Sequence, residues 1–249
     1  MSDLLAGYTA LIEHLTATPI AAIAITLLAF FLGNAIFQKM GRPTWCPAIL
    51  IAALMVVLIL ILLRIDYVQY QEGARWIILL LGPATVALGV PLFQQIHHIR
   101  ALWKPIMFTL PLAAIMAALY AILLAWLAGA PPELIASFAP KSVTAPIAIG
   151  ITEQLGGSIP ILMGGLLVTG VMATLWVNLL GRWLKIEDHR ILGFALGING
   201  HAIGTVRAFE ISPTAGAFAS LGMGLTGVFT ALFLPLVWML MGMAGMGSE

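Results

Sequence analysis

Two short stretches of an otherwise apolar sequence carry the side chains that could bind a charged ligand. A lysine or arginine at the centre of a membrane helix costs about 2.5–3.5 kcal/mol on insertion scales, so it is expected to face a partner or a cavity. Cations, hydroxyls and an amide together can hold a carboxylate through charge-assisted hydrogen bonds. The candidate substrate-binding residues are Lys141, Ser142, Thr144, Asn199, His201, Thr205 and Arg207.

Composition places the chain in a membrane and excludes several classes of protein. The chain is 61% hydrophobic and 8% charged, and its mean hydropathy of +1.07 lies far outside the range of water-soluble proteins. A net charge of +1 supplies no basic stripe for nucleic acid. Cys46 is the single cysteine, and His201 has no histidine or carboxylate four residues on, so neither a metal site nor a cofactor is expected.

Apolar runs of sufficient length predict the fold class, an all-α polytopic membrane protein. A spanning helix needs roughly 20 mainly apolar residues, whereas barrel strands alternate polar and apolar positions. Two further apolar stretches, 141–157 and 191–211, contain polar residues, Gly and Pro, which makes about eight membrane segments in all. The six plain runs are 20–37, 47–63, 76–93, 105–128, 159–180 and 216–243.

An internal repeat divides these segments into two halves of four. A shift of 115 residues superposes LGPATVALG (81–89) on LGINGHAIG (196–204) without a gap. We therefore predict a first transmembrane repeat at 19–128, a second at 134–243, and a short interfacial segment at 1–18. The polar site belongs to the second repeat, since the first has apolar residues at the positions equivalent to His201, Thr205 and Arg207.

Residues that interrupt helices predict broken or re-entrant helices near 141–157 and in the third segment of each half. Thr144 lies where a helix cap belongs and Pro146 suits a first helical turn, which would point the N–H groups of a short helix at Lys141 and Ser142. Paired interruptions of this kind indicate a secondary transporter. The sequence leaves open whether the second repeat is inverted relative to the first. The expected breaks are Gly82, Pro83, Pro91, Pro140, Pro146, Gly156, Gly157, Gly197, Gly200 and Gly204.

Most of the polar residues also have a purely structural interpretation. Lys141 could extend its ammonium to the membrane surface, and Arg207 could pair with Glu210 three residues on. The amide and the hydroxyls could serve as hydrogen bonds between helices. His201 is stronger evidence for function, because an imidazole in hydrocarbon needs a partner or a role. His201 is therefore the first candidate for proton coupling, followed by Glu153 and Glu210.

Four segments closely resemble the LrgB/CidB family, and the likeness covers about residues 20–243. Its most specific parts are the PKSVT and HAIGT motifs. Two departures bear on the substrate: Ala145 stands where a second threonine is expected, and INGH precedes the second motif where relatives tend to have small and hydroxyl residues. The segments are LLGPATVALGVPLF (80–93), PKSVTAPIAIGITEQLGG (140–157), LGINGHAIGTVRAFE (196–210) and GAFASLGMGLTGVFTALFLPL (216–236).

This resemblance implies more about function than the residues alone do. Bacterial members of the family are described as antiholin-like or holin-like regulators of murein hydrolase activity and lysis, and they usually act with a small four-helix membrane partner of the LrgA/CidA family. The plant relative is the plastid glycolate/glycerate translocator, and some bacterial relatives are linked to pyruvate uptake. The resemblance therefore implies an integral protein of the bacterial inner (plasma) membrane whose substrate is a small monocarboxylate or 2-hydroxy acid.

Two functions follow as hypotheses. The first is a secondary transporter of pyruvate, glycolate or glycerate that works by alternating access, with the substrate bound at the broken helices of the second half. The second is an antiholin-like regulator of murein hydrolase export and cell lysis that acts through a holin-like partner. A passive pore fits narrow broken helices poorly, and no nucleophile and base stand at matched spacing for an enzyme. A homo-oligomer is compatible with either function.

Overall fold

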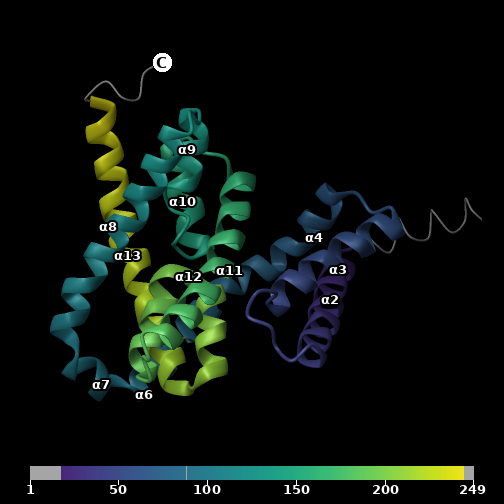
Figure 1. Cartoon of the computed structure of the whole chain (residues 1–249). Helices are drawn as coiled ribbons and strands as arrows, with labels where there is room; N and C mark the ends of the chain where they lie inside the picture. Colours follow the sequence, from purple (N-terminus) through teal and green to yellow (C-terminus); the bar gives the residue numbers. More distant parts are fainter. Residues whose placement is uncertain (1–17, 88, 244–249) are drawn as a thin grey trace, which may run out of the picture. The chain divides into compact units, whose positions relative to one another are not determined.

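The computed structural model describes residues 18–87 and 89–243, and the regular structure of these residues is entirely helical (Figure 1). The predicted interfacial segment, apart from residue 18, lies outside the described residues. The helices are α2 (Pro19–Lys39), α3 (Ala48–Leu63), α4 (Tyr67–Leu79), α5 (Leu81–Ala87), α6 (Gly89–Gln94), α7 (Ile96–Ala101), α8 (Trp103–Leu127), α9 (Pro132–Phe138), α10 (Ala145–Leu155), α11 (Ile159–Trp183), α12 (His189–Ile211) and α13 (Pro213–Met243).

Four helices of the described chain, α2, α8, α11 and α13, are long and apolar enough to cross a membrane. The apolar helix α3 is shorter, at 16 residues. The apolar run 76–93 is not one helix but is shared among α4, α5 and α6, in keeping with Pro83 and Pro91, since proline removes a backbone donor from a helix interior. Of the eight membrane segments expected from the sequence, the four others therefore stay a prediction.

The chain forms two compact units, residues 1–87 and 88–249. Helix α8 packs against α9 and α13 and so belongs to the second unit. The division into two repeats at 128–134 stays a prediction. In the first unit a Cβ at Gly33 would lie 2.8 Å from the backbone nitrogen of Ala52, so α2 and α3 are in backbone contact. Small residues allow this close packing of helices in a membrane.

In the second unit, residues 132–157 fold back on themselves, and we call them the first hairpin. It consists of α9, a turn at 139–144 and α10. The backbone N–H of Ser158 donates to the Ser137 hydroxyl at 2.7 Å, and a Cβ at Gly157 would lie 2.8 Å from the Ser137 nitrogen. The chain therefore returns to the last turn of α9, beside the start of α11.

A second reversal lies inside α12, whose residues 189–211 we call the second hairpin. The backbone of His201 has φ 41° and ψ −132°, which is not helical. A Cβ at Gly204 would overlap the carbonyl oxygen of Leu196 and lie 3.5 Å from its Cα. Residues eight apart in a continuous helix are separated by about 12 Å, so the two arms of α12 must run antiparallel from His201.

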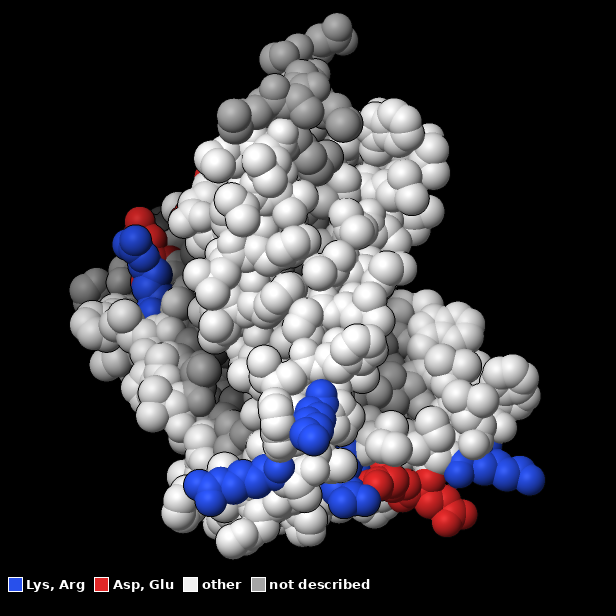
Figure 2. Space-filling model, turned by 90° about the vertical axis from the view of Figure 1, so that its left-hand side faces the viewer, with Lys and Arg blue, Asp and Glu red and all other residues white. Residues whose placement is uncertain are grey.

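The next helix, α13, runs parallel to the first arm of the second hairpin. Gly193 packs on the backbone of Ala215 and Gly197 on that of Ala219, with the same separation in sequence. Leu196, Ala208, Ala215 and Ala219 form one buried cluster there. Figure 2 shows a broad surface without charged side chains over α8 and α13, with one group of Lys, Arg, Asp and Glu at its lower edge and another at its left margin. This uncharged face suits the hydrocarbon of a bilayer.

Asp188 directly precedes the second hairpin and is the N-cap residue of α12. Its carboxylate accepts hydrogen bonds from the backbone N–H of Arg190 at 2.9 Å and from the Arg190 guanidinium at 2.6 Å. The Arg190 side chain therefore lowers the pKa of Asp188 from 3.8 to about 2.

We expect Asp188→Asn to lower the unfolding temperature of the protein at neutral pH, because the charged cap is lost. A lowered folded-state pKa stabilises the protein fully only above the unfolded pKa of 3.8, and that contribution disappears as the pH falls through about 2. Thermal unfolding in detergent between pH 6 and pH 2 should therefore show the two proteins converging in acid. A difference that is constant with pH would contradict this account of the cap.

Candidate functional site

The tips of the two hairpins meet at the middle of α11. In the first hairpin, a Cβ at Gly165 would lie 3.0 Å from the ring of Phe138, at the end of α9, and 3.9 Å from the Cβ of Lys141, in the tip. At the tip of the second, a Cβ at Gly170 would lie 3.0 Å from Cε1 of His201. The base of the first hairpin lies at the start of α11, and that of the second at its end. The hairpins therefore approach the centre of α11 from opposite ends (Figure 1).

Lys141 occupies the tip of the first hairpin and has no carboxylate partner among the described residues. Its Nζ lies 4.7 Å from the centroid of the Tyr120 ring, 3.5 Å from the Tyr120 hydroxyl and 3.4 Å from the Ser142 hydroxyl. The lysine is half-buried, and Ser142 is buried. A cation–π contact and two long hydrogen bonds hold the ammonium without neutralising it, which leaves its charge available to an anion.

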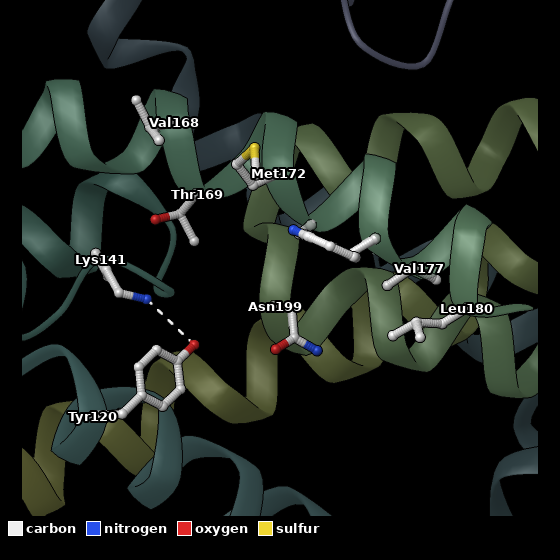
Figure 3. Close-up of a pocket in the computed structure, with 10 residues that line it drawn as sticks. Tyr120, Lys141, Val168, Thr169, Met172, Val177, Leu180 and Asn199 are labelled. Atoms are coloured by element: carbon white, nitrogen blue, oxygen red, sulfur yellow. Dashed lines mark hydrogen bonds between the residues drawn. The ribbon is translucent and has the colours of Figure 1, made fainter. Parts of the chain in front are cut away.

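One pocket of about 330 Å³ joins both hairpins, with Lys141 on one side and Asn199 on the other (Figure 3). The Asn199 amide donates to the carbonyl of Ala195 at 2.9 Å, one turn back in its helix. Helices α8 and α11 supply the rest of the lining, which is mainly apolar and includes the hydroxyls of Tyr120 and Thr169. Lys141 is the one cation in this lining.

His201 is buried beside this pocket but does not line it. Its Nε2 lies 2.9 Å from the carbonyl oxygen of Leu166 in α11, so Nε2 must carry the proton that is donated. The Thr205 hydroxyl donates to the His201 carbonyl at 2.8 Å. The His201 side chain thus links the second hairpin to α11 by a hydrogen bond. Its backbone forms the reversal of the chain.

We expect His201→Gly to be more stable than His201→Ala, by about 1–3 kcal/mol. Both variants lose the hydrogen bond to Leu166, but a backbone at φ 41° and ψ −132° is open to glycine and strained for alanine. In an ordinary helix interior the order is reversed, since glycine is about 1 kcal/mol worse than alanine. Thermal unfolding of the two variants measures the difference. Alanine as the more stable residue would mean that the chain does not reverse at this position.

Three other predicted binding residues do not line the pocket. Thr144 is half-buried and is the N-cap residue of α10, but its side chain makes no capping hydrogen bond. Thr205 is buried against Met223 of α13, with its hydroxyl 3.6 Å from the sulfur. Arg207 forms an ion pair of 2.5 Å with Glu210 on the second arm of the second hairpin. This is the structural role that the sequence offered as the alternative to substrate binding. The structure therefore joins Lys141 and Asn199 in one pocket and leaves these three outside it.

Of the proton-coupling candidates other than His201, Glu153 is exposed on the last turns of α10, and Glu210 is occupied by its ion pair. No group of three or more His, Cys, Asp or Glu able to hold a metal ion occurs among the described residues. Sequence reasoning missed Tyr120 and Thr169, because an isolated tyrosine or threonine in an apolar helix gives no signal that distinguishes a pocket from packing.

The predicted helix breaks behave in different ways. Gly156 ends α10 with φ 75°, and Pro140 and Pro146 lie in the tip and in the first turn of α10. Gly157 permits the close contact with Ser137. The glycines of α12 keep helical backbone angles, and the break lies at His201 instead. Gly82 and Pro83 lie in α5 and Pro91 in α6, and the α12 glycines are Gly197, Gly200 and Gly204.

A family profile and several individual proteins are similar to this chain over most of its length. The profile of the LrgB-like family matches residues 26–240. An uncharacterized protein of Haemophilus influenzae is 33% identical over 87% of this chain and 93% of its own length, and YxaC of Bacillus subtilis is 32% identical over 88% and 94%. The holin-like protein CidB of Staphylococcus aureus is 29% identical over 88% and 95%. No solved structure matches the chain.

Proposed function

The chain belongs to the LrgB-like family of bacterial membrane proteins, and we propose that it is a secondary transporter of small monocarboxylates or 2-hydroxy acids. The observation that carries the proposal is the Lys141 pocket: a half-buried cation without a carboxylate partner in the described chain, placed where two hairpin tips meet. Secondary transporters bind substrate where interrupted helices meet near the midplane of the bilayer.

The chemistry of the pocket favours a small acid of the pyruvate, glycolate or glycerate type. The ammonium of Lys141 would bind the carboxylate, and the hydroxyls of Tyr120 and Thr169 and the amide of Asn199 would bind a 2-hydroxyl or 2-keto oxygen. The remaining lining is apolar, including Val168, and leaves no second cation for a second carboxylate. A dicarboxylate would then be left with one charge unpaired in an apolar site.

In this proposal α11 and α13 cross the bilayer and the hairpins enter it from opposite sides. Alternating access would then arise from the movement of one hairpin relative to α11, which opens the pocket first to one side and then to the other. His201 is the proposed proton carrier, because its buried ring bridges the second hairpin to α11. Protonation of His201 would couple substrate binding to the position of the hairpin.

Uptake by proteoliposomes tests the proposal. Labelled pyruvate, glycolate and glycerate are supplied with and without an inward proton gradient, together with the dicarboxylate succinate. We expect saturable uptake of at least one monocarboxylate, stimulation by the gradient and exclusion of succinate. Uptake that does not depend on the gradient would remove His201 as the proton carrier, and the absence of saturable uptake for every monocarboxylate would overturn the transporter.

The name of the Staphylococcus aureus relative, holin-like protein CidB, favours a second candidate function. In that case the chain would regulate murein hydrolase export and lysis by binding a small LrgA/CidA-like membrane partner. Lysis control would then depend on lipid-facing surfaces and not on the pocket. Lysis assays of Lys141→Met in cells that lack the native protein separate the two functions, since a pure regulator should tolerate that change.

A further inference from the structure

A second pocket, of about 450 Å³, lies at the base of the second hairpin and is separate from the Lys141 pocket. It is bounded by the last turns of α11, by the loop that leads into α12, and by Leu192 and Ile211 at the two ends of the hairpin. Arg182, Lys185 and Glu187 supply its charged groups. From this pocket we infer a binding site for an anionic phosphate group, such as that of an acidic membrane lipid.

The cations of this pocket are not used by the protein itself. Among the described residues neither Arg182 nor Lys185 forms an ion pair, whereas Arg190 nearby is held by Asp188. The side-chain nitrogen of Asn178, which also lines the pocket, is buried and lacks a hydrogen-bond partner in the described chain. Two free cations and an unused amide donor provide the groups that bind phosphate oxygens.

The backbone of Lys185 has a strained conformation. After α11 the chain closes with a hydrogen bond of 2.8 Å from the Ile186 N–H to the Gly181 carbonyl, and Lys185 takes a left-handed conformation with φ 53°. Glycine is the usual residue at such a helix end, since any other residue is disfavoured there by roughly 1–2 kcal/mol. The strained lysine adds to the lining of the pocket a charge that a glycine could not supply.

The surroundings place this pocket at a bilayer surface. It lies at the C-terminal end of α11, a helix long enough to span, and Trp183 beside it is 76% exposed. Tryptophan is enriched at membrane interfaces, where basic pockets bind lipid headgroups. Ile186, Leu192 and Ile211 form the apolar part of the lining, against which an acyl chain could lie. A lipid bound there would contact both ends of the second hairpin.

The test measures the unfolding temperature of the purified protein in detergent as a function of added phosphatidylglycerol or phosphatidylcholine, from which an affinity for each lipid follows. We expect the wild-type protein to bind phosphatidylglycerol, the anionic lipid, about ten-fold more tightly than phosphatidylcholine. Arg182→Gln and Lys185→Gly should each weaken that binding about five-fold, because each removes roughly one charge interaction with the headgroup. Glu187→Gln should strengthen it by removing a like charge.

Lys185→Gly separates binding from folding, since glycine relieves the strained backbone and should leave the unfolding temperature without lipid unchanged or higher. The matched control is Arg100→Gln, an exposed cation of α7 outside the pocket, which should bind like wild type. Inorganic phosphate is tested in parallel: stabilisation that needs Lys185 would identify a soluble phosphate as the source. Equal binding of both lipids together with no effect of phosphate, or pocket variants that bind like wild type, would overturn the site.

Discussion

Lys141→Met is expected to reduce carboxylate uptake by about 10- to 150-fold. A hydrogen bond to a charged group is worth about 1.5–3 kcal/mol, and Lys141 is the one cation in the lining of its pocket. Methionine keeps the length and the apolar stem of the side chain, so the pocket keeps its shape. Initial rates of uptake at subsaturating substrate report the loss.

The unfolding temperature of Lys141→Met should stay close to that of wild type, because the lysine has no ion-pair partner among the described residues. Lys104→Met is the matched control, since Lys104 also lies over an aromatic ring, that of Trp103 at 5.9 Å, but outside the pocket. Full uptake by Lys141→Met, or an equal loss in both variants, would contradict the role of the pocket.

Gly197→Ala is expected to destabilise the second unit by about 1–3 kcal/mol or more, the usual range for overpacking. The new Cβ would overlap the Ala219 carbonyl oxygen and lie 2.7 Å from its carbon. Both atoms belong to the backbone of α13, which cannot yield as a flexible side chain can. The first arm of the second hairpin would be forced away from α13, and uptake should fall together with the unfolding temperature.

Gly224→Ala is the control for this change. Gly224 is also a helical glycine, in α13, but no atom outside its own helical turn lies within 4 Å of the position that a Cβ would take. Alanine should raise helix stability there by up to about 1 kcal/mol. Equal unfolding temperatures for Gly197→Ala and Gly224→Ala would show that the hairpin does not pack against α13 as described.

Composition and segment length predicted the helical membrane fold, because a helix that spans hydrocarbon requires a long run of apolar residues. The positions of α2, α3, α8, α11 and α13 match predicted apolar runs. The reversal at His201 was not predictable at that residue, because glycines surround it and each was an equally plausible break. The choice among them depends on the contact of the imidazole with α11, which is a tertiary interaction.

The candidate site was predictable in part for the same reason. Lys141 and Asn199 stand out as polar groups in apolar segments, and the structure brings them to one pocket. Arg207 stands out equally, yet it pairs with Glu210 three residues on. A single sequence does not reveal which cation is neutralised by its neighbours. Tyr120 became part of the site only through the packing of α8 near the first hairpin.

The most direct test of the substrate site uses a single cysteine at the pocket. Cys46 is the one cysteine of the chain, so Met172→Cys in a Cys46→Ser background places a lone thiol in the lining, at a position 41% exposed. Leu179→Cys, on the same helix but outside the lining, is the control. If the pocket binds small carboxylates, pyruvate or glycolate should slow alkylation of Met172→Cys and not that of Leu179→Cys, and Lys141→Met should abolish the protection. Alkylation of Met172→Cys at the same rate with and without a transported carboxylate would contradict the claim that the substrate binds between the hairpin tips.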